Sequence, residues 1–290
     1  MWFYAALLGA LISGIITIFS KHTLKTISPI VFFWAVLLVS SPFILLFAWK
    51  DGIPSLGPGF IIGIAGSVIL YSIARIVFYH VIKDAHLSQV YPLVTLGPIF
   101  TLVFAFVILS EKPTVYALFG SLITLAGTYV LNISSLREGL LEPFKILFRN
   151  KFALLMLVYV VINGAVSVFD KLAINNTFPE HTSFALLIED LVIIVAFLPW
   201  IIKERRIAIP EILNNKMPLL ILGILGAASN ILIFFAFAGG DTGIVTSIFR
   251  TQVFFVILLS FLFFKDRPKT ETIIGTIVMI LGLVITKLAS

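Results

Sequence analysis

Ten long runs of apolar residues, separated by short polar stretches, constrain the fold of this chain more than any other feature. Each run approaches the roughly 20 apolar residues that a helix needs to cross a bilayer. Only 12% of the residues are charged, about half the share of a typical soluble domain. We therefore predict an all-α membrane protein with ten transmembrane helices. Their expected bounds are near 3–20, 30–49, 60–82, 87–110, 113–132, 151–174, 182–202, 217–238, 243–264 and 270–288.

The two halves of the chain carry similar residues in the same order. Each half has a matching segment in its first predicted helix, a Gly-x-x-Gly pair in its third, and a charged pair followed by proline before its fifth. The matches are Gly14–Lys21 with Gly164–Lys171, Gly63-x-x-Gly66 with Gly223-x-x-Gly226, and Glu111-Lys112-Pro113 with Asp266-Arg267-Pro268. Their offsets of 150, 160 and 155 residues are similar, so the three weak matches together indicate an internal duplication.

Five helices in each copy is an odd number, so the second copy must enter the membrane upside down relative to the first. We predict a first five-helix repeat at 1–132, a linker at 133–150 and a second, inverted five-helix repeat at 151–290, arranged around a central cavity. Inverted repeats supply two equivalent gates around one site. This arrangement favours transport over a duplication that is kept only for packing.

Lys and Arg residues are distributed unevenly between the two sides of the predicted bundle. Of the twenty, fourteen lie on the side opposite the N-terminus, four on the N-terminal side and two inside spans. Because basic loops stay in the cytoplasm, this count predicts a multi-pass protein of the cell (inner) membrane with both termini outside. Topology thus explains the basic residues, and no nucleic-acid partner is expected.

No Lys or Arg precedes Lys21, so the first run lacks the charged start of a signal peptide and is predicted to be a retained helix.

The chain resembles the EamA family of the drug/metabolite transporter superfamily over essentially its whole length. The resemblance rests on Gly14–Lys21, on Leu109-Ser110-Glu111-Lys112-Pro113 with Gly120 and Gly127, and on Phe264-Lys265-Asp266-Arg267-Pro268 with Gly275 and Gly282. It implies a cavity lined by helices one to four and six to nine, and export of amino acids or other metabolites. It also implies cytoplasmic termini, which conflicts with the charge count. We follow the count, because a bias of fourteen to four is large.

Polar side chains inside the apolar runs mark the predicted cavity, because a charge at bilayer depth costs roughly 2.5–3.5 kcal/mol. In the third helix, a stripe of polar residues recurs every four positions, at Ser67, Tyr71, Arg75 and Tyr79. Arg250 lies near the middle of the ninth helix, with Thr246 one turn before it. The expected substrate-binding residues are Arg75, Tyr71, Tyr79, Arg250, Glu189, Asn230 and Trp34. The alternative is that both arginines are structural ion-pair partners.

Other charged residues in the spans are candidates for coupling and gating. Glu189 and Asp190, near the middle of the seventh helix, are the candidates for a coupling proton, and a fixed salt bridge is the equal alternative. Lys21 and Lys171 occupy equivalent positions near the ends of the first and sixth helices. Together with Asp170 they are gate candidates, although lysines near span ends often only extend toward the membrane surface.

The sequence lacks the motifs of other functional classes. It has no cysteine, no HExxH pair, no nucleophile elbow and no phosphate-binding glycine loop, so we expect no enzyme activity, no cofactor and no metal site. The predicted function is secondary transport of a small polar metabolite by alternating access, with an amino acid or a related organic anion or zwitterion as the best fit. The expected partners are this substrate, the lipid bilayer and a coupling proton or ion, and the expected state is a monomer or homodimer. A lipid flippase or scramblase with a polar groove is the alternative.

Overall fold

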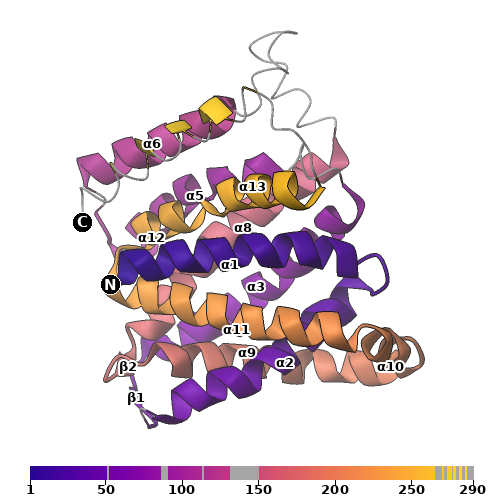
Figure 1. Cartoon of the computed structure of the whole chain (residues 1–290). Helices are drawn as coiled ribbons and strands as arrows, with labels where there is room; N and C mark the ends of the chain where they lie inside the picture. Colours follow the sequence, from indigo (N-terminus) through magenta and orange to yellow (C-terminus); the bar gives the residue numbers. More distant parts are fainter. Residues whose placement is uncertain are drawn as a thin grey trace.

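The computed structural model describes residues 1–50, 52–85, 91–112, 114–130 and 150–264, with short pieces between 270 and 285. Within these residues the chain folds almost entirely into helices, with one pair of two-residue strands (Figure 1). The predicted linker, apart from Asn150, and most of the predicted tenth helix lie outside the described residues, as does the motif at 266–268.

Among the described residues, six helices are long and apolar enough to cross a membrane. They are α1 (Trp2–Thr23), α2 (Pro29–Lys50), α3 (Gly59–Asp84), α8 (Lys151–Ile174), α9 (Thr182–Lys203) and α11 (Lys216–Gly239). Their ends lie within three residues of the predicted spans, because long apolar runs with polar flanks define helices well. Leu46, Ile61 and Val195 are 71%, 76% and 66% exposed, as expected for side chains that face lipid.

The predicted fourth span is not one continuous α-helix, which corrects the sequence prediction. It consists of a 3₁₀-helix, η1 (Tyr91–Leu96), then α5 (Gly97–Phe104) and a π-helical turn, η2 (Ala105–Leu109). Pro92 and Pro98 flank the junction between η1 and α5. Proline has no backbone N–H to donate, so regular helical hydrogen bonding cannot run through this region.

The predicted ninth span is also broken. It is divided into α12 (Thr242–Phe249) and α13 (Gln252–Phe264), with a turn at Arg250 and Thr251. The backbone N–H groups of residues 253 and 254 donate to the carbonyls of Arg250 and Thr251 at 3.1 and 2.9 Å, which is the tighter spacing of a 3₁₀ turn. α13 begins 155 residues after α5, and this distance equals the offset of the third repeated motif.

Two further helices lie in the described part of the chain. α6 (Val115–Val130) corresponds to the predicted fifth span. α10 (Arg205–Asn214) lies in a stretch that the sequence predicts as a loop, because it is too polar and too short to span a bilayer. Glu211 of α10 accepts hydrogen bonds from the backbone N–H and the hydroxyl of Ser28, at 3.0 and 2.9 Å, and so caps the start of α2.

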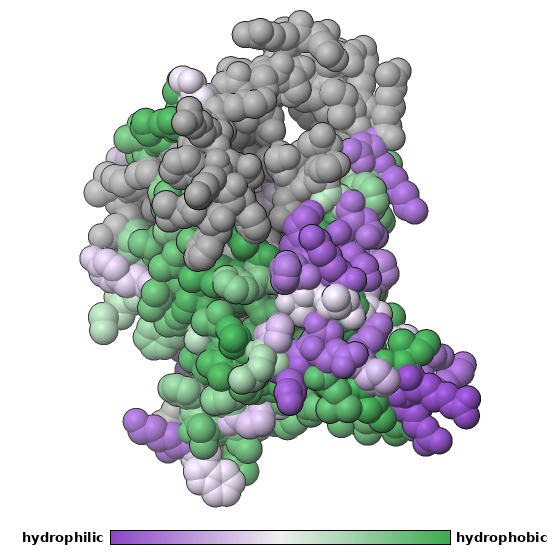
Figure 2. All heavy atoms as spheres, turned by 45° about the vertical axis from the view of Figure 1, so that its right-hand side comes forward, coloured by the Kyte–Doolittle hydropathy of each residue, from purple (hydrophilic) through white to green (hydrophobic). Residues whose placement is uncertain are grey.

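The long helices pack in pairs that join the two halves of the chain. α3 packs mainly on α8, and α1 packs mainly on α11. At one end of the bundle, β1 (Ser55–Leu56) pairs antiparallel with β2 (Thr177–Phe178), near the N-terminus (Figure 1). α10 lies at the opposite end. Figure 2, in which the α10 end is turned forward, shows hydrophilic side chains gathered at this end beside extensive apolar surface. The α10 end of the molecule is therefore polar, and an apolar surface lies beside it along the helices.

Candidate substrate-binding cavity

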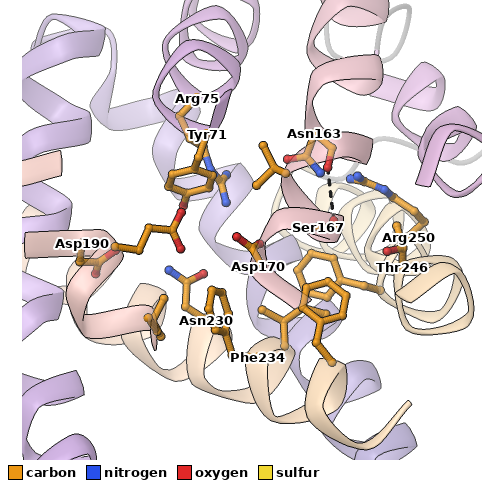
Figure 3. Close-up of a pocket in the computed structure, with 16 residues that line it drawn as sticks. Tyr71, Arg75, Asn163, Ser167, Asp170, Asp190, Asn230, Phe234, Thr246 and Arg250 are labelled. Carbon is orange, nitrogen blue, oxygen red and sulfur yellow. Dashed lines mark hydrogen bonds between the residues drawn. The ribbon is translucent and has the colours of Figure 1, made fainter. Parts of the chain in front are cut away.

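A cavity of about 60 Å³ lies inside the bundle, with walls from both halves of the chain (Figure 3). Its volume accommodates several water molecules. It is lined by Tyr71, Arg75, Asn163, Val166, Ser167, Asp170, Leu186, Glu189, Asp190, Asn230, Ile233, Phe234, Phe237, Thr246, Phe249 and Arg250. Seven of the residues that the sequence analysis proposed for binding, coupling or gating line this cavity, namely Tyr71, Arg75, Asp170, Glu189, Asp190, Asn230 and Arg250. They come from five helical segments, so distant parts of the sequence meet at one cavity.

Arg75 of α3 enters the cavity beside Tyr71. Its guanidinium carbon lies 4.8 Å from the centroid of the Tyr71 ring, which is a cation–π contact. The Nε atom of Arg75 is buried and has no hydrogen-bond partner. Of the stripe predicted for this helix, Tyr71 and Arg75 line the cavity, and Ser67 contacts Asp170, which is another lining residue.

Arg250 enters the cavity from the break between α12 and α13, and Thr246 lies one turn before it (Figure 3). The Arg250 side chain is only 1% exposed, and its Nε atom has no hydrogen-bond partner. Gly97, the first residue of α5, makes room for this group, because a β-carbon there would lie 2.6 Å from the Arg250 Nε atom. Within the described residues, no ion pair joins Arg75 or Arg250 to a carboxylate. The fixed salt bridges considered from the sequence are therefore absent from this part of the chain.

Three carboxyl groups lie on the same cavity. The Ser67 hydroxyl contacts Asp170 Oδ1 of α8 and, at 2.6 Å, Glu189 Oε1 of α9. Asp190 accepts a hydrogen bond of 3.2 Å from the hydroxyl of Ser40 in α2. Although Glu189 and Asp190 are adjacent in sequence, they contact different neighbouring helices, as the 100° step of an α-helix requires. Both carboxyl groups also line the cavity.

The two gate candidates, Lys21 and Lys171, bind the ends of neighbouring helices. Lys21 donates a hydrogen bond of 2.7 Å to the carbonyl of Ala85, the residue after α3. Lys171 donates to the carbonyl of Phe237 near the end of α11, and at 3.2 Å to that of Gly240. Each lysine thus satisfies carbonyl groups that a helix end leaves without partners, and its charge favours that end. Neither lysine lines the cavity.

Two predicted binding residues lie outside the cavity lining. Tyr79 packs edge-to-face on Phe32 at a centroid distance of 4.9 Å, and Trp34 donates its indole N–H to the Ile194 carbonyl at 3.1 Å. The lining also contains Asn163, Ser167 and Thr246, which the sequence analysis did not assign to substrate binding, along with the apolar wall residues. Asn163 and Ser167 lie at a spacing of four from each other and from Lys171, and this spacing places them on the same helical face.

Comparisons with known proteins place the chain in a family. The EamA-like transporter family matches residues 1–133 and 150–288. A protein of Archaeoglobus fulgidus described as an uncharacterized transporter is 38% identical over 64 residues, which is 22% of this chain and 22% of that relative's length. A solved crystal structure has the same fold, with a TM-score of 0.69 and 15% identity over 99% of this chain and 96% of the other. The chain is therefore a multi-pass membrane protein that belongs to the EamA-like transporter family.

Proposed function

We propose that this protein is a secondary carrier for a small metabolite that bears a carboxylate, with an amino acid or a related organic anion or zwitterion as the preferred class. Two guanidinium groups in one cavity carry this proposal, because the Nε atoms of Arg75 and Arg250 are buried without a hydrogen-bond partner and neither side chain has an ion-pair partner in the described residues. A buried cation is costly unless it is paired. A carboxylate bound by Arg250, by Arg75 or by both would supply the missing charge-assisted hydrogen bonds.

The other cavity walls fit a zwitterion better than a simple anion. Asp170 and Glu189 offer carboxyl oxygens to an ammonium group, and the Asn230 amide can donate to or accept from either end of the substrate. Phe234, Phe237 and Phe249 supply apolar surface for a short side chain. The small volume of the cavity favours a substrate of few atoms.

Alternating access is the transport mechanism that this architecture supports. Discontinuous helices next to a central site are common in carriers built from inverted repeats. In this chain the fourth and ninth spans break at positions related by the repeat offset. The packing of α3 on α8 corresponds to the packing of α11 on α1, because α1 and α8 are the first helices of the two halves and α3 and α11 are the third. We propose that the halves rock around the cavity, with Lys21 and Lys171 holding the ends of α3 and α11.

The placement of the polar residues favours a carrier over a lipid flippase. A flippase groove would present polar side chains on a surface open to lipid, whereas Arg250, Glu189 and Asp190 are buried and line an internal cavity. Polar groups that converge inside a bundle select a substrate that fits completely within it.

Counterflow in proteoliposomes tests the transport function. Vesicles that contain the purified protein are loaded with one unlabelled amino acid or carboxylic acid and diluted into a trace of the labelled compound. We expect saturable accumulation for at least one amino acid, and no movement of a headgroup-labelled phospholipid between leaflets. Lipid movement without exchange of any amino acid or carboxylate would favour the flippase alternative instead.

Labelling of single cysteines tests the proposed orientation, in which both termini lie outside the cell membrane. The chain has no cysteine, so Lys216→Cys and Glu180→Cys each introduce one thiol. Both positions are exposed, and they lie beyond opposite ends of α9. An impermeant maleimide added to intact cells should label position 180 and should reach position 216 only after lysis. The reverse pattern would place the termini in the cytoplasm.

A further inference from the structure

The hydroxyl of Ser67 lies within hydrogen-bond distance of two carboxyl groups at once. Its oxygen contacts Asp170 Oδ1 and Glu189 Oε1. A serine hydroxyl carries one hydrogen and therefore donates to only one of the two oxygens. An ionised carboxylate has no hydrogen to donate, so the second contact is a hydrogen bond only when one of the two acids is protonated.

We infer that Asp170 and Glu189 hold one proton between them through Ser67 in the substrate-free carrier, and that a substrate ammonium group replaces this proton. The inference rests on the proposed transport function and specifies its coupling. The site is buried, since Ser67, Asp170 and Glu189 are 0%, 7% and 3% exposed. Two ionised carboxylates in such surroundings would repel each other strongly, and a single positive charge between them removes that repulsion.

The unpaired guanidinium of Arg250 is an independent sign that a ligand belongs in this cavity. The side chain is nearly completely buried, its Nε atom lacks a partner, and it faces the cavity that Asp170 also lines. In Figure 3, Asp170 projects into the space between Arg75 and Arg250. A zwitterion can therefore place its carboxylate at Arg250 and its ammonium group at the acidic pair.

Charged neighbours of the pair come from three elements. Tyr71 and Arg75 of α3, Asp190 of α9 and Arg250 at the break between α12 and α13 are the charged or titratable side chains that line the cavity with it in the described chain. Lys171, next to Asp170, is directed to the carbonyls of α11.

The proton and an ammonium group both carry one positive charge, so each satisfies the pair in the absence of the other. One proton would then leave for water whenever one ammonium group binds, and transport would exchange substrate for protons.

Infrared spectroscopy tests the shared proton without any substrate. The purified protein at neutral pH should show the C=O stretch of a protonated carboxylic acid. Asp170→Asn and Glu189→Gln should each remove the part of this band that is due to the pair. Asp190→Asn, which changes the adjacent residue, should leave that part in place. Absence of the band, or its survival in both of the first two variants after their folding is confirmed by gel filtration, would overturn the inference.

Proton release on binding tests the exchange. Glycine, alanine and leucine are each added to the protein in weak buffer with a pH indicator, in parallel with acetate, propionate and 4-methylpentanoate, which lack the amino group. Bound amino acids should release up to one proton each, and the amine-free acids should release none. Amino acids that bind without proton release would overturn the exchange and leave the carrier function intact. If none of the six compounds binds and counterflow is also absent, the proposed function fails, whereas the infrared band still decides whether the proton is shared.

Discussion

Replacing Arg250 by alanine should weaken binding of the native substrate by about 10- to 150-fold. This range corresponds to the roughly 1.5–3 kcal/mol of a hydrogen bond to a charged group, at about 1.4 kcal/mol for each factor of ten. Arg250→Lys should recover only part of the affinity, because an ammonium group cannot form the two parallel hydrogen bonds of a guanidinium. Arg75→Ala and Arg75→Lys should follow the same order if both arginines contact the substrate.

A binding titration on purified, monodisperse variants measures these losses. Arg206→Ala is the matched control, because Arg206 lies exposed on α10, outside the cavity. Gly97→Ala moves the Arg250 guanidinium without removing it, because the added β-carbon would occupy the place of that group. The flexible Arg250 side chain can move aside, so we expect weaker substrate binding with little loss of stability. Unchanged affinity in all four folded arginine variants would show that the guanidinium groups have a structural role only.

The sequence was most informative where a single physical constraint acts on many residues. Apolar length predicted the six long helices, since each must match the thickness of a bilayer. The cost of a charge at that depth identified Arg75, Glu189 and Arg250 as cavity residues. Both the required helix length and the cost of a buried charge are set by the lipid bilayer around the chain. They can therefore be applied to the sequence without knowing which helices are neighbours.

Periodicity was less reliable, because it defines a helix face but not how far along that face the cavity extends. Tyr79 follows Arg75 on the α3 stripe, yet at its level α2 presents Phe32 and Phe33, and the tyrosine packs on them. The break at Arg250 has no proline or glycine beside it in the sequence, so hydropathy predicted a continuous helix. The contact between Ser67 and Asp170 depends on the packing of α3 on α8, which no local pattern reveals.

Replacing Gly63 by alanine should destabilise the protein by about 1–3 kcal/mol, the usual cost of overpacking a close contact. A β-carbon at Gly63 would lie 2.6 Å from the backbone nitrogen and 2.8 Å from the Cα of Ala173 in α8. A backbone cannot move aside as a side-chain end can, so α3 and α8 must separate. Alanine has a higher helix propensity than glycine by roughly 1 kcal/mol in solution, and this gain offsets only part of the loss.

Gly226→Ala is the matched control, because Gly226 belongs to the corresponding Gly-x-x-Gly pair and its nearest neighbour would be Val36 at 3.7 Å. Thermal unfolding in detergent, followed by the loss of the monodisperse peak in gel filtration, should show a lower midpoint for Gly63→Ala and an unchanged or higher midpoint for Gly226→Ala. Because Gly63 lies one turn before Ser67 on α3, separation of the two helices should also lengthen the contact between Ser67 and Asp170. Equal unfolding midpoints for the two alanine variants would contradict the close packing of α3 on α8. If the two helices separate, Gly63→Ala should also reduce the infrared band of the shared proton, in addition to lowering the stability of the protein.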